Sequence, residues 1–88
     1  MINEVKYIVI LNSNRYASLL YKKLKRRGCR VEYISAPVQL AKSCKKAVRF
    51  NGSDLEIVKE EIKKSRLQFK GIYKMELKNR KKSYVLVR

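Results

Sequence analysis

The chain has 88 residues and a formal net charge of +16, because it contains 23 Lys and Arg residues but only seven acidic residues. This length predicts a single domain over residues 1–88, and an apolar content of 45% argues against disorder. The chain has no histidine, the commonest general base, and no apolar run near the ~20 residues that span a bilayer. Without a secretion-signal pattern either, we expect a cytoplasmic protein with no membrane partner that is attracted to polyanions.

Apolar periodicities of about two and about 3.6 alternate along the chain. Residues 5–11 form a β-branched and aromatic run, which is typical of a central strand buried on both faces. The polar residues 12–14 supply helix-capping side chains. Residues 15–27 then repeat apolar side chains at helical spacing, and Gly28 ends the predicted helix.

The middle of the chain predicts two more strands. Residues 29–35 form one, and Pro37 ends it because proline cannot join a central ladder. Residues 38–43 are expected to form a loop or a single helical turn. The alternation over residues 45–50, with Val48 and Phe50 on one face, predicts the next strand.

A second helix and a C-terminal hairpin complete the predicted elements. Asn51-Gly52 indicates a turn, and residues 53–56 match a capping box in front of an amphipathic helix. Residues 70–77 predict a strand, and residues 83–87 predict an additional one after the basic turn 78–82. The order β-α-β-β-α-β favours an α+β, ferredoxin-like split sheet that is mostly antiparallel, with both helices on one face.

Cys44 is the candidate reactive residue of the chain. The thiolate is the reactive form of cysteine, and the nearby cations Lys42, Lys45 and Lys46 favour it. The alternative is a small apolar residue in a loop beside solvated lysines. Cys44 and Cys29 are too few and too far apart to indicate a metal site, and we expect none. Cys29 follows Gly28 at a strand start and is interpreted as a packing residue.

Short segments spread over residues 7–77 resemble, in order and spacing, a family of small bacterial proteins grouped as selenium/sulfur carrier-like, a domain of unknown function. The segments that carry this resemblance are Tyr7-Ile8-Val9, Gly28, Ala36-Pro37, Ser43-Cys44, Ala47-Val48-Arg49-Phe50, Asp54-Leu55 and Gly71-Ile72-Tyr73. The family has a Ser-Cys-Gly motif. Ser43 and Cys44 match it, whereas Lys45 replaces its glycine.

The resemblance implies that Cys44 carries sulfur or selenium as a persulfide or selenosulfide. A donor such as a cysteine desulfurase would load Cys44, and an acceptor protein would receive the atom. Arg49 would help to hold the anion, while Lys42 and Lys45 would raise the thiolate fraction. The chain would then be a carrier rather than an enzyme, with no cofactor.

Nucleic-acid binding is the main alternative. Basic residues on the first helix and in the turn 78–82 can hold phosphates, and tyrosines of the predicted strands can stack on RNA bases. Residues 46–50 lack the glycine and paired aromatics of an RNA-recognition motif. The tyrosines concerned are Tyr7, Tyr33, Tyr73 and Tyr84.

Self-association is a third interpretation, because pairing of two open sheet faces would give a homodimer. It is compatible with either of the other two functions. The acidic residues suggest no paired-carboxylate site, and Glu60 is expected to pair with Lys64 one helical turn away.

Overall fold

The computed structural model describes residues 5–37, 40 and 45–88, and in these ranges it has five strands and two α-helices. In chain order they are β1 (Lys6–Leu11), α1 (Asn14–Arg26), β2 (Val31–Ser35), β3 (Lys46–Asn51), the 3-10 turn η1 (Gly52–Asp54), α2 (Leu55–Lys64), β4 (Phe69–Lys78) and β5 (Lys81–Leu86). The strands form one open sheet in the order β2-β3-β1-β4-β5, and every neighbouring pair is antiparallel. The predicted antiparallel α+β architecture with a fifth strand is confirmed.

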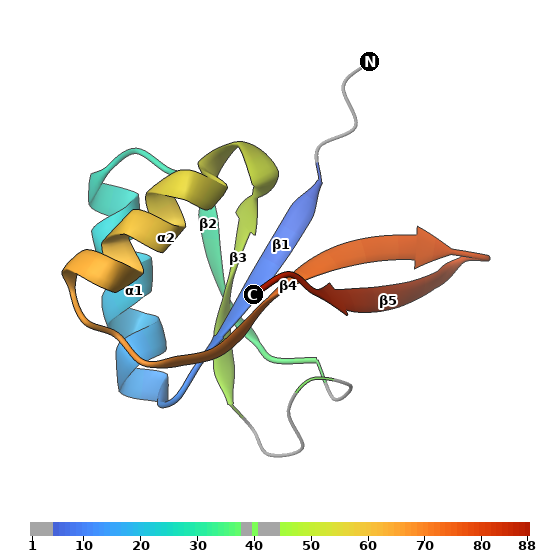
Figure 1. Ribbon diagram of the computed structural model, residues 1–88, viewed down its shortest axis with the longest axis horizontal. Coiled ribbons are helices and arrows are strands. Elements are labelled where there is room, and N and C mark those ends of the chain that lie inside the picture. The colour runs from blue at the N-terminus through green and yellow to red at the C-terminus, as the bar shows by residue number, and fades with distance from the viewer. Residues whose placement is uncertain (1–4, 38–39, 41–44) are drawn as a thin grey trace.

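Both helices lie on one face of the sheet (Figure 1). Alternate strand residues point toward the helices and pack against their apolar stripes, since successive side chains of a strand face opposite sides. Neither described helix is long and apolar enough to cross a membrane. The core between the two layers includes Val9, Leu11, Val48, Phe50 and Ile72 of the sheet and Ala17, Leu20, Leu24, Val58 and Ile62 of the helices.

β1 is buried on both faces, as its continuous apolar run predicts. Ile8 and Ile10 point away from the helices and form a second cluster with Ala47, in which each residue is at most 1% exposed. The chain after β2 and the β4–β5 hairpin cover this cluster in place of a helix. The half-buried residues around it are Ile34, Ala36, Leu40, Tyr73, Met75 and Tyr84.

α1 is capped at both ends by residues that the sequence identifies. The extended Ser13 accepts a hydrogen bond from the backbone N–H of Tyr16 at 3.2 Å. Gly28 has φ +83°, and the N–H of Cys29 donates to the carbonyl of Leu24 at 3.1 Å. A left-handed residue at this position is the common end of a helix, and glycine adopts it without strain.

Several strand boundaries differ from the predicted ones. β2 begins at Val31 rather than at Cys29, because the N–H of Cys29 closes α1 instead of joining the sheet. β3 lies one residue later than predicted. β4 ends later and β5 begins earlier than predicted, because the turn between them consists of Asn79 and Arg80 rather than residues 78–82.

The capping box predicted at residues 53–56 is wrong. η1 leads directly into α2, so that Asp54 rather than Ser53 occupies the N-cap position. Asp54 has φ −98° and ψ 3°, and its side chain makes no capping hydrogen bond. A side-chain cap normally needs an extended residue there, and the 3-10 turn prevents this conformation.

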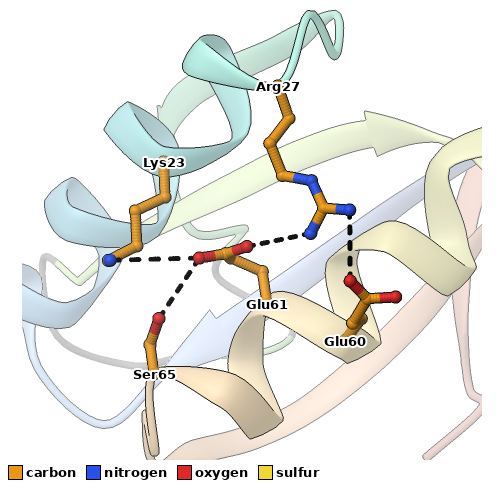
Figure 2. A network of polar contacts seen from close by, with 5 residues as sticks. All are labelled: Lys23, Arg27, Glu60, Glu61 and Ser65. Carbon is orange, nitrogen blue, oxygen red and sulfur yellow. Dashed lines mark hydrogen bonds and ion pairs between the residues drawn. The ribbon is translucent and has the colours of Figure 1, made fainter.

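The helices are joined by a polar network around the buried Glu61 (Figure 2). Arg27 bridges two carboxylates of α2, with Nη1 at 3.0 Å from Glu61 Oε2 and Nη2 at 3.2 Å from Glu60 Oε1. Lys23 Nζ lies 3.9 Å from Glu61 Oε1, and Ser65 Oγ donates to the same oxygen at 3.3 Å. A buried carboxylate requires such partners to remain charged.

This network changes the predicted role of Glu60 and the pKa of Glu61. Glu60 pairs with Arg27, which directly follows α1, rather than with Lys64 of its own helix. Burial alone would raise the pKa of Glu61, but hydrogen bonds from Arg27 and Ser65 and the nearby cations outweigh it. The pKa of Glu61 therefore lies below its ordinary value.

Candidate functional site

The predicted carrier residue lies outside the described residues, together with Lys42 and Ser43. The same is true of the predicted loop 38–43, apart from residue 40. Lys45 and Arg49 are described, and Lys45 directly follows Cys44 in the chain. The described part of the candidate site therefore consists of residues around the start of β3.

The start of β3 is attached to two other elements. The carbonyl of Lys45 accepts a hydrogen bond of 2.7 Å from the N–H of Ala36, just after β2. The N–H of Lys46 donates to Asn14 Oδ1, in the first turn of α1, at 2.8 Å. Lys46 Nζ also donates to Ser35 Oγ at 3.1 Å. These bonds hold the chain immediately after Cys44 between β2 and the N-terminus of α1.

The first turn of α1 supplies a positive electrostatic environment at this point. The N-terminus of a helix carries a partial positive charge from its exposed N–H groups. Ser13 satisfies one of these groups, and the first turn contains no acidic residue to neutralise the rest. Asn14, which begins the helix, also contacts Lys46. An anion near the start of β3 would therefore be stabilised by the helix.

Lys45 also lies beside a lysine from β4. The side-chain contact with Lys70, which is also a cation, and partial loss of solvent lower the pKa of Lys45. The start of β4 is held nearby because the N–H of Asn12 donates to the carbonyl of Gln68 at 3.0 Å. We refer to Asn14, Lys45, Lys46 and Lys70 as the Lys45 cluster.

Lys45 does not adopt the left-handed backbone conformation that favours glycine. Among the described residues other than glycine, only Arg66, Asn79 and Arg80 have positive φ. A lysine at position 45 is therefore accommodated without the strain that a left-handed backbone imposes on a side chain. This leaves charge, not backbone shape, as the main consequence of the replacement.

Arg49 is not brought together with Lys45. Its Nε donates to Glu32 Oε1 at 3.0 Å, and its Nη2 pairs with Glu32 Oε2 in a two-point contact across β2 and β3. The hydrogen bonds raise the pKa of Arg49 and lower that of Glu32. Four residues of extended chain, about 13 Å, separate positions 45 and 49.

Cys29 is a packing residue, as predicted. It is 7% exposed and belongs to the core between the helices and the sheet. Burial, followed by the charge of Asp54, raises the pKa of the Cys29 thiol, and the charge of Arg27 opposes this only in part. A protonated, buried thiol is a poor nucleophile.

The four strand tyrosines do not share a face of the sheet. Tyr7 packs with the core on the helix side and stacks on Phe50 with ring centroids 5.8 Å apart. Tyr33 contacts Tyr21 of α1, also on the helix side. The remaining two, Tyr73 and Tyr84, pack on the opposite face. A single stacking platform for RNA bases would need them together.

A groove of about 710 Å³ runs along α2 and the start of β4. Its lining includes the apolar residues Ile62, Phe69 and Ile72 and the cations Arg66 and Arg88. Neither Lys45 nor any other member of the Lys45 cluster lines it. The groove is therefore a different surface from the candidate site. The described residues contain no group of three His, Cys, Asp or Glu side chains that could hold a metal ion.

Sequence reasoning missed two members of the Lys45 cluster. The sequence predicts Asn14 only as part of the cap before the first helix and Lys70 only as a strand residue. For Asn14 there is a weak sequence signal. Residues 12–14 offer three cap-type side chains, although one is enough to cap the helix. For Lys70 there is no local signal, because its position beside Lys45 depends on the pairing of β1 with both β3 and β4.

The comparisons with known proteins identify a family. The model of the family described as "Putative Se/S carrier protein-like" matches residues 6–74, from the start of β1 to the middle of β4. Comparisons with curated proteins and with solved structures gave no significant match. The match spans well over half of the chain and includes Lys45 and every other member of the Lys45 cluster. The chain therefore belongs to the Se/S carrier protein-like family.

Proposed function

We propose that the chain carries sulfur or selenium on Cys44 and exchanges it with donor and acceptor proteins. The observation that supports this most directly is the Lys45 cluster, which surrounds the residue after Cys44 with cations and the N-terminus of α1. Cations and helix N-termini favour thiolates over thiols. Membership of the Se/S carrier protein-like family supports the same function.

The proposed transfer requires no external oxidant. The Cys44 thiolate attacks the terminal sulfur of a donor persulfide, a new S–S bond forms, and the S–S bond of the donor breaks to release the donor thiolate. Cys44 then carries a persulfide, and an acceptor nucleophile removes its terminal sulfur and regenerates the Cys44 thiolate. A donor selenosulfide would transfer selenium in the same way.

The Lys45 cluster favours the anionic thiolate and persulfide forms of Cys44 in this transfer. The side chains of Lys45 and Lys70 are in contact and repel each other. An anionic sulfur beside Lys45 reduces this repulsion. Arg49 has no direct part in the proposed site, because Glu32 already occupies its guanidinium group. Cys29 is also excluded, since its thiol is buried and its pKa is raised.

The element order also supports the ferredoxin-like arrangement predicted from the sequence, which we retain as a proposal. Its support is the order β2-β3-β1-β4 within the sheet, with antiparallel neighbours and both helices on one face. In this arrangement the start of β3 and the N-terminus of α1 lie at the same end of the sheet.

Sulfur loading of matched cysteine variants tests the proposal. Wild type, Cys44→Ser and Cys29→Ser are treated with glutathione persulfide and analysed by intact-mass spectrometry. Wild type and Cys29→Ser should gain one sulfur atom and pass it to a second thiol, whereas Cys44→Ser should do neither. Loading of Cys44→Ser at the wild-type rate would show that Cys44 is not the carrier.

The role of the cluster is tested by the pH dependence of Cys44 alkylation. Lys70→Gln removes one cation and should move the midpoint to higher pH and slow sulfur loading at neutral pH. Lys74→Gln, four residues further along β4, makes the same charge change and serves as the control. Equal effects of the two variants would mean that only net charge acts on Cys44.

A further inference from the structure

The β4–β5 hairpin extends beyond the rest of the sheet. β1 pairs with β4 only as far as Tyr7 and Lys74, whereas β4 and β5 remain paired as far as Lys78 and Lys81. Residues 75–84 therefore form a two-stranded ribbon, which projects away from the helices (Figure 1). Four residues of strand beyond Lys74 extend it by about 13 Å.

The ribbon ends in a tight turn. Asn79 has φ 50° and Arg80 has φ 65°, and two successive left-handed residues between paired strands are typical of a type I′ hairpin. Asparagine adopts this conformation easily, but for arginine it costs about 1–2 kcal/mol. The turn therefore presents the Arg80 side chain at the end of the ribbon.

Three cations at the end of the ribbon are exposed and have no acidic partner among the described residues. They are Arg80, Lys81 and Lys82. By contrast, Lys23 on α1 and Arg27 directly after this helix are paired with carboxylates of α2. The ribbon cations are thus available to an external anion.

These cations face more than one side of the ribbon. Lys81 and Lys82 are adjacent strand residues, so their side chains point to opposite faces, and Arg80 lies at the tip. Lys82 is opposite Leu77, which is 72% exposed. The end of the ribbon at Leu77 is therefore open to a large partner.

The dimensions and charge of the ribbon fit double-stranded DNA. The major groove of B-form DNA is about 12 Å wide and admits a two-stranded β-ribbon between two rows of phosphates. Paired strands lie about 5 Å apart, which leaves room for side chains that reach phosphates on either side. A second copy of the chain is a poor partner, because each copy has a charge of +16.

Other nucleic acids fit less well. Single strands are held by aromatic platforms, but the four strand tyrosines are divided between the two faces of the sheet. The major groove of A-form RNA is too deep and narrow for side chains to read. We propose that the ribbon 75–84 is a DNA-binding arm whose cations contact phosphates of duplex DNA, independently of the proposed sulfur transfer.

The test compares two variants of equal charge. Arg80→Gln/Lys81→Gln/Lys82→Gln changes the ribbon, and Lys22→Gln/Arg26→Gln/Arg30→Gln removes the same charge from exposed positions on and just after α1. Binding of each to a fluorescein-labelled DNA duplex of mixed sequence is measured by anisotropy at several salt concentrations. Circular dichroism checks that both variants retain the wild-type fold.

The ribbon variant should bind at least about tenfold more weakly, and the slope of log K against log salt should fall by about 2–3, roughly 0.9 for each lost phosphate contact. The control should change the slope by less than about one. Equal losses in the two variants would overturn the proposal, as would tighter binding of the wild type to a single strand or an RNA duplex of the same sequence.

A second measurement keeps the test valid if the ribbon variant is destabilised. Backbone amide shifts of the wild-type chain, followed by NMR during titration with the duplex, should change most in residues 75–84. Shifts concentrated on α1 would overturn the proposal. Cys44→Ser should bind the duplex like the wild type, so failure of the sulfur-transfer proposal would leave this result unaffected.

Discussion

Asn14 Oδ1 accepts a hydrogen bond of 2.8 Å from the backbone N–H of Lys46, and so joins the first turn of α1 to the first residue of β3. The two residues are 32 positions apart in the chain. Because Lys46 lies two residues after Cys44, this bond sets the position of the helix N-terminus relative to the chain that leaves the proposed carrier residue.

Removing the Asn14 acceptor should loosen the start of β3. We expect Asn14→Ala to lower the free energy of unfolding by about 1 kcal/mol and to accelerate hydrogen exchange of the Lys46 amide. Asn14→Asp keeps an acceptor in place and should protect that amide. Unchanged exchange in Asn14→Ala would show that the bond contributes nothing in solution.

The contact between Lys45 and Lys70 predicts a coupled titration. Lys70→Gln removes the neighbouring cation that lowers the pKa of Lys45, so this pKa should rise toward its ordinary value. The measurement is an NMR pH titration of the Lys45 side chain. Lys74→Gln should leave the pKa unchanged, and a pKa that does not move in Lys70→Gln would contradict the contact.

Glu61 should make stability depend on pH in the acidic range. Its pKa is lower in the folded chain than its ordinary value, so its contribution is complete above the unfolded pKa and is lost as the pH falls through the folded pKa. Glu61→Gln should cost about 1–3 kcal/mol at neutral pH, and the cost should shrink in acid. Urea unfolding at several pH values measures both effects.

The matched control for Glu61 is Glu60, whose side chain is 64% exposed although it also pairs with Arg27. Exposed ion pairs are screened by solvent, so Glu60→Gln should cost less than about 1 kcal/mol at neutral pH. If the two variants lost equal stability, the burial of Glu61 would not be the source of its contribution.

Gly28 should tolerate substitution only at a cost in backbone strain. A Cβ at this position would have no atom within 4 Å, but φ is +83°. Gly28→Ala should therefore lower the free energy of unfolding by about 1–2 kcal/mol, as measured by urea unfolding. Gly28→Asn should cost less, because asparagine adopts the left-handed conformation more readily. No loss in Gly28→Ala would contradict this explanation.

Features that depend on neighbours along the chain were predictable from the sequence. The apolar run of β1, the Ser13 cap and the left-handed end of α1 at Gly28 each arise from local sterics, hydrogen bonding or periodicity. The burial of Cys29 also followed from its residue type and its position after Gly28. The capping box at residues 53–56 failed because its motif competes with a 3-10 turn of similar local geometry.

Tertiary structure alone decided which charged side chains meet. The sequence shows 23 basic residues, yet it does not reveal that Lys45 contacts Lys70, that Arg49 is held by Glu32, or that the ribbon cations have no acidic partner in the described part of the chain. Electrostatic energies depend on distance and solvent exposure, and for residues far apart in the chain both are set by strand pairing and helix packing. The sequence determined a basic α+β chain with one candidate carrier cysteine, whereas the fold determined which charges surround the start of β3.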